Sequence, residues 1–451
     1  MSQVRLEDHF TAGKIFRAVI GPIGMVLFSS FYTIADGIFL SQKGGQGAFS
    51  GANLIFPLLM IFGSFGFMFG SGGNALVSKT LGEKDPKKAN RYFSLVVYST
   101  FVFGILLAII SYFVVEPVAN FFASIEKDAA SSSDAMIQSA ITYGHILSLG
   151  LPLFLLQNMF TSFFSTAQKP GLGFFVTFLA GITNIIFDAI FILGCNWSVT
   201  GAAIASVMGQ ALGALIPLFY FFFSKKSLIH LGTTKFEGKP LLKVMSNGSS
   251  EFVSNTASAI VGLTYNIQLL RYIGEDGVAS YAILQYIGYL FMAIYLGYSL
   301  GLSPVVGYHY GAKNHKELHN LLCRSLIFLA MAGLLMFGLS EALATVLASL
   351  FSGSNESLKA LSERAIRIYC TIFLTSGFSI FASGYFTALS NGLVSAIISF
   401  VRTFVFELVF VFTLPLLWGA DGIWAAAPFA EIGSSAVTLF FFLRERKKYG
   451  Y

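Results

Sequence analysis

The sequence has little charge and very little cysteine. Only 11% of its 451 residues are charged, and only three are cysteine. Cys195, Cys323 and Cys370 lie far apart and lack the spacing of zinc ligands, so the sequence predicts neither a disulfide framework nor a structural zinc site. It also lacks a polar stretch long enough to fold on its own, which excludes a separate soluble domain.

Apolar residues are abundant instead. They make up 55% of the chain, and the mean hydropathy is +0.73. Apolar runs of roughly 20 residues or more recur throughout, and each is long enough to cross a bilayer core of about 30 Å as a helix. The sequence therefore predicts an all-α integral membrane protein with about twelve transmembrane helices. The expected spans are 13–41, 51–80, 91–116, 137–168, 170–195, 199–224, 243–271, 278–310, 319–350, 360–390, 394–418 and 422–443.

The positions of Lys and Arg predict the orientation in the membrane. If the N-terminus lies inside, most of the 28 basic residues fall in inner loops and ends, including the clusters at 84–91 and 444–448. Cytoplasmic segments carry such an excess, so both termini are expected in the cytoplasm. This topology accounts for the net charge of +6 and implies no nucleic-acid partner.

One motif occurs twice. The string GSGGNALVSKTLGEKDPKKAN in the first half returns as SLGLSPVVGYHYGAKNHKELH in the second. At a constant offset of roughly 229 residues, Gly72 matches Gly301 and Gly82 matches Gly311. In a membrane protein such a repeat is typical of a transporter built from two related bundles.

The repeat defines the expected organisation. Six spans per copy is an even number, so both copies enter the membrane in the same direction and are related by an axis along its normal. We expect an N-terminal six-helix bundle at 1–224, a cytoplasmic linker at 225–242 and a C-terminal six-helix bundle at 243–451. A cavity is expected between the bundles, near the middle of the bilayer.

The repeated motif also contains helix-start signals. In the first copy, Asp85 can cap the next helix and Pro86 can occupy its first position. In the second copy, Asn314 can cap and Glu317 follows at the spacing of a capping box. The motif is thus either a plain helix-turn-helix connection or a part of the gate.

Two acids lie within spans of the first half. Asp36 and Asp188 are each preceded by a polar residue four positions earlier, Tyr32 and Asn184, which places each pair on one helix face. Ser206 on the sixth helix can add a hydroxyl. Acids in the membrane are costly and usually functional. These oxygens suit a hard cation such as sodium, but a buried carboxylate pair can equally share a proton.

The second half does not repeat this acid pair. Its own candidates are Glu251 near the start of the seventh helix, Glu407 on the eleventh and Glu431 on the twelfth. Arg402 lies five residues before Glu407, which favours a structural ion pair between these two. For Glu251 and Glu431 a functional role and a solvated helix end are both compatible with the sequence.

Pro22 lies inside the first expected helix. Proline removes a backbone hydrogen bond and clashes with the preceding turn, so this position predicts either a hinge that moves Asp36 or a static bend.

Several of these strings together resemble a known family. FYTIADGIFLS, the glycine motif, ITNIIFDAIFILGCNWSVTGAAIAS and VRTFVFELVFVFTLPLLWGADGIWAAAPFAE are similar to segments of the multidrug and toxic compound extrusion (MATE) transporters. The acids of the first half resemble the DinF-type branch. By this resemblance the cation site comprises Asp36, Asn184, Asp188 and Ser206, and the substrate cavity includes Tyr32, Asp36 and Asn158.

The chain departs from the NorM-like branch, which has acids on the seventh and tenth helices. Glu251 supplies the first, but the tenth expected helix contains no acid in its apolar part, AIRIYCTIFLTSGFSIFASGYFTALSNG. A sodium site of that kind is therefore not expected in the second half.

The resemblance implies a monomeric antiporter of the bacterial cytoplasmic membrane. It would export small organic compounds, often cationic or amphipathic, in exchange for H⁺ or Na⁺ by alternating access, with no other cofactor. The alternative is a flippase for a lipid-linked intermediate, which would call for a strongly cationic cavity. An enzyme is not expected, because no His, Asp and Ser residues are clustered at catalytic spacing.

Overall fold

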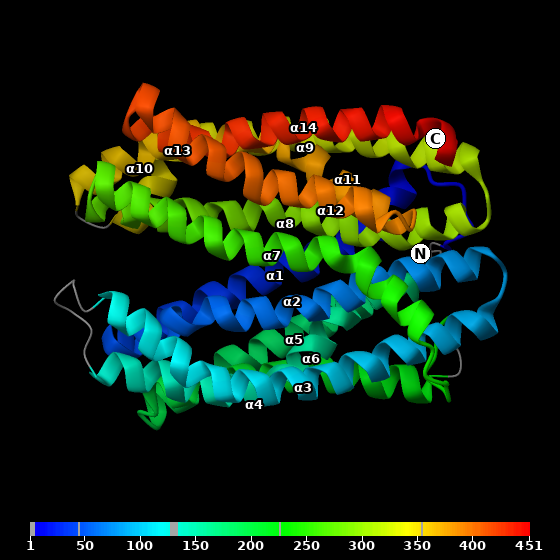
Figure 1. Cartoon of the computed structure of the whole chain (residues 1–451), viewed down its shortest axis with the longest axis horizontal. Helices are drawn as coiled ribbons and strands as arrows, with labels where there is room; N and C mark the ends of the chain where they lie inside the picture. The colour runs from blue at the N-terminus through cyan, green and yellow to red at the C-terminus, as the bar shows by residue number, and fades with distance from the viewer. Residues whose placement is uncertain (1–4, 44–45, 127–133, 225–226, 353–354) are drawn as a thin grey trace.

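The computed structural model describes residues 5–43, 46–126, 134–224, 227–352 and 355–451, and the regular secondary structure in these ranges is helical (Figure 1). The first half contains six rods. They are α1 (Ala12–Lys43), α2 (Gln46–Gly82), α3 (Pro86–Glu126), α4 (Asp134–Thr166), α5 (Pro170–Asp188) continued by the π-helical η1 (Ala189–Gly194), and α6 (Ser198–Phe223).

The second half contains six more rods in its described residues. They are α7 (Gly238–Tyr272), α8 (Glu275–Gly311), α9 (His315–Ser352), α10–η2–α11 (Glu356–Tyr369, Cys370–Leu374, Ser376–Ala388), α12–η3–α13 (Gly392–Phe400, Val401–Phe406, Glu407–Trp418) and α14 (Ala420–Tyr449). The predicted twelve-helix membrane fold is confirmed. Helix α7 begins at Gly238, five residues before the expected 243, and Lys225 and Lys226 of the linker lie outside the described residues.

Helix α7 is the least apolar of the long rods. Within the described residues, ten helices, and the bent α10–α11 rod as an eleventh, are long and apolar enough to cross a membrane, whereas α7 does not meet that test. Its first half is rich in Ser, Asn and Gly, and it packs against α2 and α12. On α7, therefore, neighbouring helices cover part of the surface that faces lipid on the other rods.

The tenth rod is broken, contrary to the continuous helix expected at 360–390. Helices α10 and α11 meet at an angle of 40°, with a short 3₁₀ segment between them. Backbone carbonyls freed by a break in a membrane need other donors. The Tyr295 hydroxyl donates to the Phe373 carbonyl (2.5 Å), and the Ser435 hydroxyl donates to the Thr375 carbonyl (3.4 Å). The break is thus satisfied by hydroxyls of α8 and α14.

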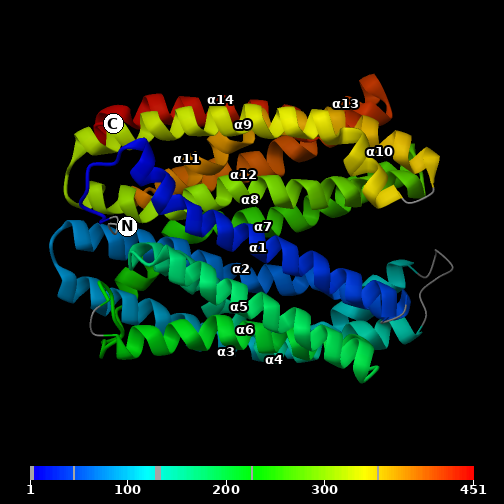
Figure 2. The same cartoon turned by 180° about the vertical axis from the view of Figure 1, so that it is seen from behind.

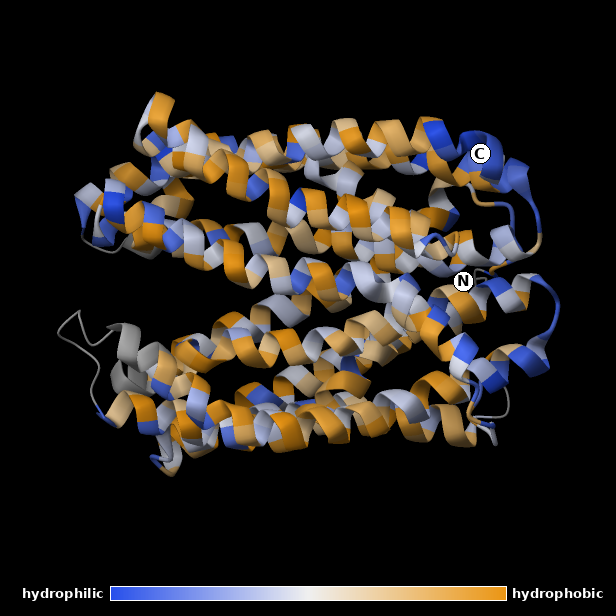
Figure 3. Ribbon diagram, in the orientation of Figure 1, coloured by the Kyte–Doolittle hydropathy of each residue, from blue (hydrophilic) through white to orange (hydrophobic). Residues whose placement is uncertain are grey.

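The outer surface is that of a membrane protein. Large apolar side chains such as Ile327, Met331 and Leu334 of α9 are exposed. Figure 3 shows hydrophobic residues along the middle of the rods and hydrophilic residues concentrated towards the ends.

The two halves converge towards the end that carries both termini and diverge towards the opposite end (Figures 1 and 2). At the convergent end, α2 meets α8 through equivalent positions of the repeat. The Asn74 amide donates to the Ser303 hydroxyl (3.3 Å), and these residues are 229 positions apart.

The same pairing continues for two more turns. A Cβ on Gly307 would lie 2.2 Å from the Ser78 hydroxyl oxygen, and one on Gly82 would lie 2.0 Å from the Tyr308 carbonyl oxygen. Likewise, a Cβ on Gly311 of α8 would lie 2.0 Å from the Lys79 carbonyl oxygen of α2. We call the pairs Asn74–Ser303, Ser78–Gly307 and Gly82–Gly311 the axial contact. Two residues that occupy equivalent positions in the two halves can meet only on the symmetry axis that relates the halves.

Close glycine contacts flank the axis. A Cβ on Gly72 of α2 would lie 2.0 Å from the Val244 carbonyl oxygen, and one on Gly248 of α7 would lie 2.0 Å from the Met68 carbonyl oxygen. Small residues let helix backbones approach closely in lipid, where the hydrophobic effect does not drive helices together. The repeated glycines of the sequence are therefore the surface that joins the two halves.

The caps of the repeated motif are partly as predicted. Helix α3 begins at Pro86, and the Lys88 N–H donates to the Asp85 carboxylate (3.0 Å). The Glu317 N–H donates to the Asn314 side chain (3.2 Å), which confirms that cap as well. The Glu317 carboxylate, however, does not close a capping box, because it binds the N-terminal segment.

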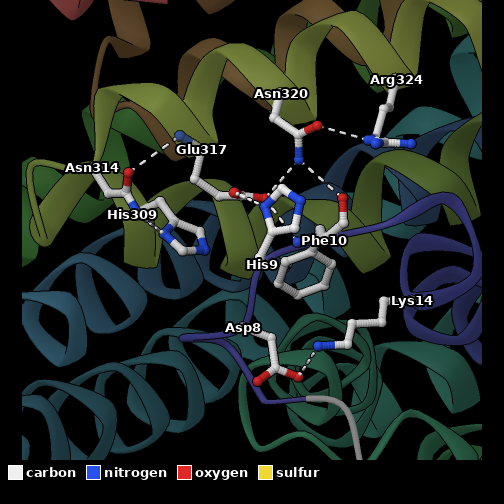
Figure 4. A network of polar contacts seen from close by, with 9 residues as sticks. All are labelled: Asp8, His9, Phe10, Lys14, His309, Asn314, Glu317, Asn320 and Arg324. Atoms are coloured by element: carbon white, nitrogen blue, oxygen red, sulfur yellow. Dashed lines mark hydrogen bonds and ion pairs between the residues drawn. The ribbon is translucent and has the colours of Figure 1, made fainter.

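Residues 5–11, here named the N-terminal strap, cross from the first half to the second (Figure 4). The Glu317 carboxylate accepts the Phe10 N–H (2.9 Å) and lies 2.7 Å from His9 Nδ1. The Asn320 amide donates to the Phe10 carbonyl (2.9 Å). The Phe10 ring is fully buried and meets His309 edge-on at 6.2 Å. The strap thus fastens the two halves beside the axial contact.

The strap is also held by the helix that follows it. Partial burial works to raise the pKa of Asp8, but the hydrogen bond from Lys14 (3.0 Å), the Arg5 N–H and the two nearby positive charges hold that pKa below its usual value. The stabilisation from this carboxylate is therefore present at neutral pH and is lost as the pH falls through the lowered pKa.

Replacing Gly248 by Leu should separate α7 from α2. The new side chain would collide with the Met68 backbone, and overpacking of this kind costs about 1–3 kcal/mol or more. We expect a fall of several degrees in the unfolding temperature of the detergent-solubilised protein. Gly262→Leu is the matched control on the same helix, because a Cβ there has nothing within 4 Å. Equal effects of the two substitutions would contradict the role of Gly248.

Replacing Glu317 by Ala should release the strap. Hydrogen bonds to a charged group contribute about 1.5–3 kcal/mol, and each 1.4 kcal/mol corresponds to about a tenfold change in opening equilibrium. Amide exchange of residues 5–11, followed by mass spectrometry, should therefore accelerate at least about tenfold. Glu7→Ala is the control, because Glu7 is exposed in the same segment. Unchanged exchange in Glu317→Ala would show that other contacts hold the strap.

Candidate functional site

A small cavity of about 110 Å³ lies inside the first half, between α1, α2, α4, α5 and α6. Tyr32 and Asp36 reach it from α1, Asn184 from α5 and Ser206 from α6. The structure therefore brings together four of the residues singled out in the sequence, and Asp188 lies against Asp36 at its edge.

The two aspartates form the centre of this cluster. The two carboxyl groups lie close enough for their charges to interact, and Asp188 is fully buried. Within the described residues, no donor reaches Asp36 Oδ1, either oxygen of Asp188, or the Asn184 side-chain carbonyl. A buried ionised carboxylate without a partner is very costly. A proton shared by the carboxyls or a cation among the oxygens would stabilise this arrangement.

The amide of Asn184 is oriented by α6. Its nitrogen donates to the Ser206 hydroxyl (3.4 Å), which leaves the amide oxygen as one of the unpartnered acceptors. An amide and a hydroxyl held in this way add neutral oxygen ligands to the two carboxylates, as hard cations prefer.

The local sequence explains the geometry. Asn184 and Asp188 share a face of α5, and the chain widens into the π-helical η1 directly after Asp188. Such π segments occur frequently at functional sites. A Cβ on Gly209 of α6 would lie 2.9 Å from the Ala180 carbonyl oxygen, so the glycine lets α6 approach α5 closely enough to bring Ser206 to the amide.

Three polar residues of the cluster were missed from the sequence. The Tyr143 hydroxyl lies within hydrogen-bonding range of Ser206, and Gln157 within range of Tyr32. Gln210 also lines the cavity, and its buried side-chain oxygen has no partner among the described residues. Gln210 follows Ser206 by one helical turn, so the spacing that linked Asn184 to Asp188 was available for it too.

Asn158 is placed differently from the expectation. Its amide donates to the Gly63 carbonyl of α2 (3.4 Å), and it is not among the residues that line this cavity. The side chain of its neighbour Gln157 lines the cavity instead, because consecutive residues of a helix point about 100° apart.

The second half holds a separate charged cluster. Arg402 pairs with Glu431 (3.0 Å), whose other oxygen accepts the Ser379 hydroxyl (2.6 Å). The expected pair of Arg402 with Glu407 is wrong, because α14 presents Glu431 to the guanidinium and the Tyr265 hydroxyl of α7 binds Glu407. Glu431 is only 3% exposed, so it is not a solvated helix end.

Glu407 is bound by a tyrosine, and Glu251 lies elsewhere on α7. The Tyr265 hydroxyl donates to Glu407 (2.6 Å), and Tyr265 occupies the position that matches Asp36 in the repeat. Because α7 begins at Gly238, Glu251 lies well inside that helix and not near its start. Across the described residues there is no group of three or more His, Cys, Asp or Glu side chains arranged to hold a metal. A cation in either half would therefore need amide, hydroxyl or solvent oxygens as well.

Pro22 lies where α1 is held by both halves. A Cβ on Gly297 of α8 would lie 2.9 Å from the Pro22 carbonyl carbon, and one on Gly21 would lie 2.8 Å from the Pro170 carbonyl oxygen of α5. The part of α1 that carries Asp36 extends beyond this clamp. A bend at Pro22 would therefore move Asp36 relative to a fixed base.

The chain is similar to known transporters over its whole length. The MatE family model matches residues 22–190 and 252–413, one segment in each half. Multidrug export protein MepA of Staphylococcus haemolyticus (strain JCSC1435) is 24% identical over 442 residues, which are 96% of this chain and 94% of that protein.

Solved structures agree in fold. A crystal structure described as MATE in complex with MaL6 superposes with a TM-score of 0.89 at 20% identity, covering 100% of this chain and 99% of the other. A structure described as MATE in the straight conformation also gives 0.89, at 21% identity and 100% and 98% coverage. Since the family model spans both halves and the fold matches throughout, the chain belongs to the MatE family, whose members are membrane transporters and not enzymes.

Proposed function

We propose that this protein is a monomeric antiporter of a bacterial cytoplasmic membrane, which exports small organic compounds in exchange for H⁺ or Na⁺. The observation that carries the proposal is the buried pair Asp36–Asp188, whose oxygens lack donors within the described residues. The similarity to a protein named for multidrug export supports drugs and related cationic or amphipathic compounds as the exported class.

The distribution of Lys and Arg supports cytoplasmic termini. In that orientation the axial contact and the N-terminal strap close the cytoplasmic side, while the halves diverge towards the outside. The described conformation is then outward-facing, the state in which a coupling ion enters and a drug leaves. The inward-facing state requires the axial contact and the strap to separate.

Coupling is proposed to run through α1. Neutralising the Asp36–Asp188 pair removes the repulsion between two buried carboxylates. It thereby changes how the part of α1 that follows Pro22 packs against α5. Binding of the ion and binding of the drug then favour different arrangements of the same helix, which is what exchange requires. One charge crossing 100 mV supplies about 2.3 kcal/mol, enough for a roughly fifty-fold gradient of an uncharged drug; exchange of one ion for one monovalent cationic drug moves no net charge and depends on the concentration gradient of the ion.

The flippase alternative has less support. A lipid-linked pyrophosphate would need an uncompensated positive cavity, but Arg402 is already paired with Glu431. The cavity between α1 and α5 has an excess of acceptor oxygens instead.

Replacing Asp36 by Asn should abolish gradient-driven export. The substitution keeps the size of the side chain but removes one of the two charges that the ion neutralises. The measurement is efflux of a cationic dye from proteoliposomes, with a sodium gradient and a proton gradient imposed separately. We expect at least one gradient to drive the dye in the native protein and neither to drive it in Asp36→Asn.

Asp85→Asn is the matched control, because Asn caps a helix as well as Asp and the site is remote. Native-like, gradient-driven efflux by Asp36→Asn would refute the coupling role of the aspartate pair. If neither gradient drives dye in the native protein, the proposed drug export itself is contradicted.

Ser206 should set the affinity for the coupling ion. Ser206→Ala removes the hydroxyl that accepts from Asn184 and should raise the ion concentration for half-maximal efflux by about tenfold, the equivalent of one hydrogen bond of about 1.4 kcal/mol. Ser206→Thr keeps the hydroxyl and should stay within about twofold of the native value. An unchanged half-maximal concentration in Ser206→Ala would exclude the hydroxyl from the ion site.

A further inference from the structure

A groove on the outside of the second half is not used by the proposed transport mechanism. It has a volume of about 480 Å³ and lies between α9 and α14, with Phe378 of α11 at its floor. Its walls are apolar, with Leu322 and Leu326 on α9 and Leu439 and Phe442 on α14. Helix α9 packs mainly on α8 and α10, and α14 mainly on α13, which leaves the space between them open to the membrane.

The length of the groove matches one leaflet of a bilayer. It runs along α14 from Arg446 to Ser435, which is about 16 Å at 1.5 Å per residue. Half of a hydrocarbon core of about 30 Å is about 15 Å. The volume is also within the range of about 300–1,000 Å³ that small-molecule sites occupy.

The first half shows what fills such a groove. At the repeat offsets, α3 corresponds to α9 and α6 to α14. Between α3 and α6 the linker folds back, so that Ile229 is fully buried and Leu231 is 6% exposed. Its backbone is held at both walls: the His230 N–H donates to Asn90 of α3 (3.0 Å), and the Leu231 N–H donates to the Phe221 carbonyl of α6 (2.8 Å).

The second half has the same walls, but among its described residues no linker folds into the space; Tyr451, which is 5% exposed, lines the groove and donates to the Phe442 carbonyl (3.3 Å). His319 stands at the position of Asn90 and is exposed at the mouth of the groove. Thr438 is 3% exposed and lines the groove, yet its hydroxyl has no partner in the part of the chain that the structure describes. An apolar slot with an unpartnered hydroxyl inside and polar groups at its mouth is suited to an amphipathic ligand.

The charge at the mouth determines the class of ligand. Arg446 lines the groove and forms no ion pair with any described residue, whereas Arg444 and Lys448 both face Glu445, at 3.8 and 3.3 Å. Basic pockets between membrane helices on the cytoplasmic side bind anionic headgroups. We propose that this groove binds one anionic phospholipid of the cytoplasmic leaflet, with an acyl chain between α9 and α14 and the phosphate at Arg446 and His319.

The test is direct lipid binding to the full-length protein in detergent. Delipidated protein is titrated with phosphatidylglycerol or phosphatidylcholine, and bound lipid is counted by native mass spectrometry. We expect one phosphatidylglycerol to bind at least tenfold more tightly than phosphatidylcholine. Arg446→Gln should remove this preference, whereas Arg444→Gln, on the same helix but outside the groove lining, should keep it.

A second pair of variants tests the groove itself. Leu439→Trp places a large ring on the apolar wall of the groove and should weaken binding at least fivefold. Ile432→Trp, at a similarly exposed position outside the groove lining, should not. Equal binding of the two lipids, equal losses in the two arginine variants, or native binding in Leu439→Trp would each overturn the proposal. Because the readout is lipid binding, the result is independent of whether the protein exports drugs.

Discussion

The close approach of α2 and α8 on the repeat axis is the contact on which the arrangement of the two halves depends. At Gly82 and Gly311 the helix backbones are so near that any side chain would collide with the opposite carbonyl. Lipid offers no hydrophobic force to press helices together, so association has to come from packing and hydrogen bonds at short range. Glycine and the Asn74–Ser303 hydrogen bond supply both within a few turns of helix.

Concentrating the contact at one end leaves the opposite end free to vary. The acid pair lies within one half, on α1 and α5, and neither helix forms the axial contact. Helix α1 is clamped near Pro22 by α5 and α8 and reaches the site at Asp36. A chemical event at the aspartates is thus connected to the interface between the halves through α1, and also through α2, which lines the cavity and carries the axial contact.

The sequence was most informative where a strong physical rule applies. Hydropathy predicted the rods, the repeat offset predicted two related six-rod halves, and the cost of membrane acids led to the cluster of Asp36, Asn184, Asp188 and Ser206. Relations that depend on register failed. The partner of Arg402 is Glu431 on α14, and Glu407 is bound by Tyr265 on α7, neither of which the spacing within one helix can reveal. The tenth rod is broken where α8 and α14 supply hydroxyls. Tyr143 and Gln157 were missed, since nothing in α4 alone reveals which neighbours it faces.

The axial contact also constrains how such a chain can have arisen. If a single ancestral bundle once formed a symmetric dimer, each on-axis residue met its own copy, as in any isologous interface. A residue in that place must be complementary to itself, which excludes a lone charge and favours glycine or a side chain that both donates and accepts. Gly82 opposite Gly311 still obeys this rule, while Asn74 opposite Ser303 shows that fusion into one chain has allowed the two positions to diverge.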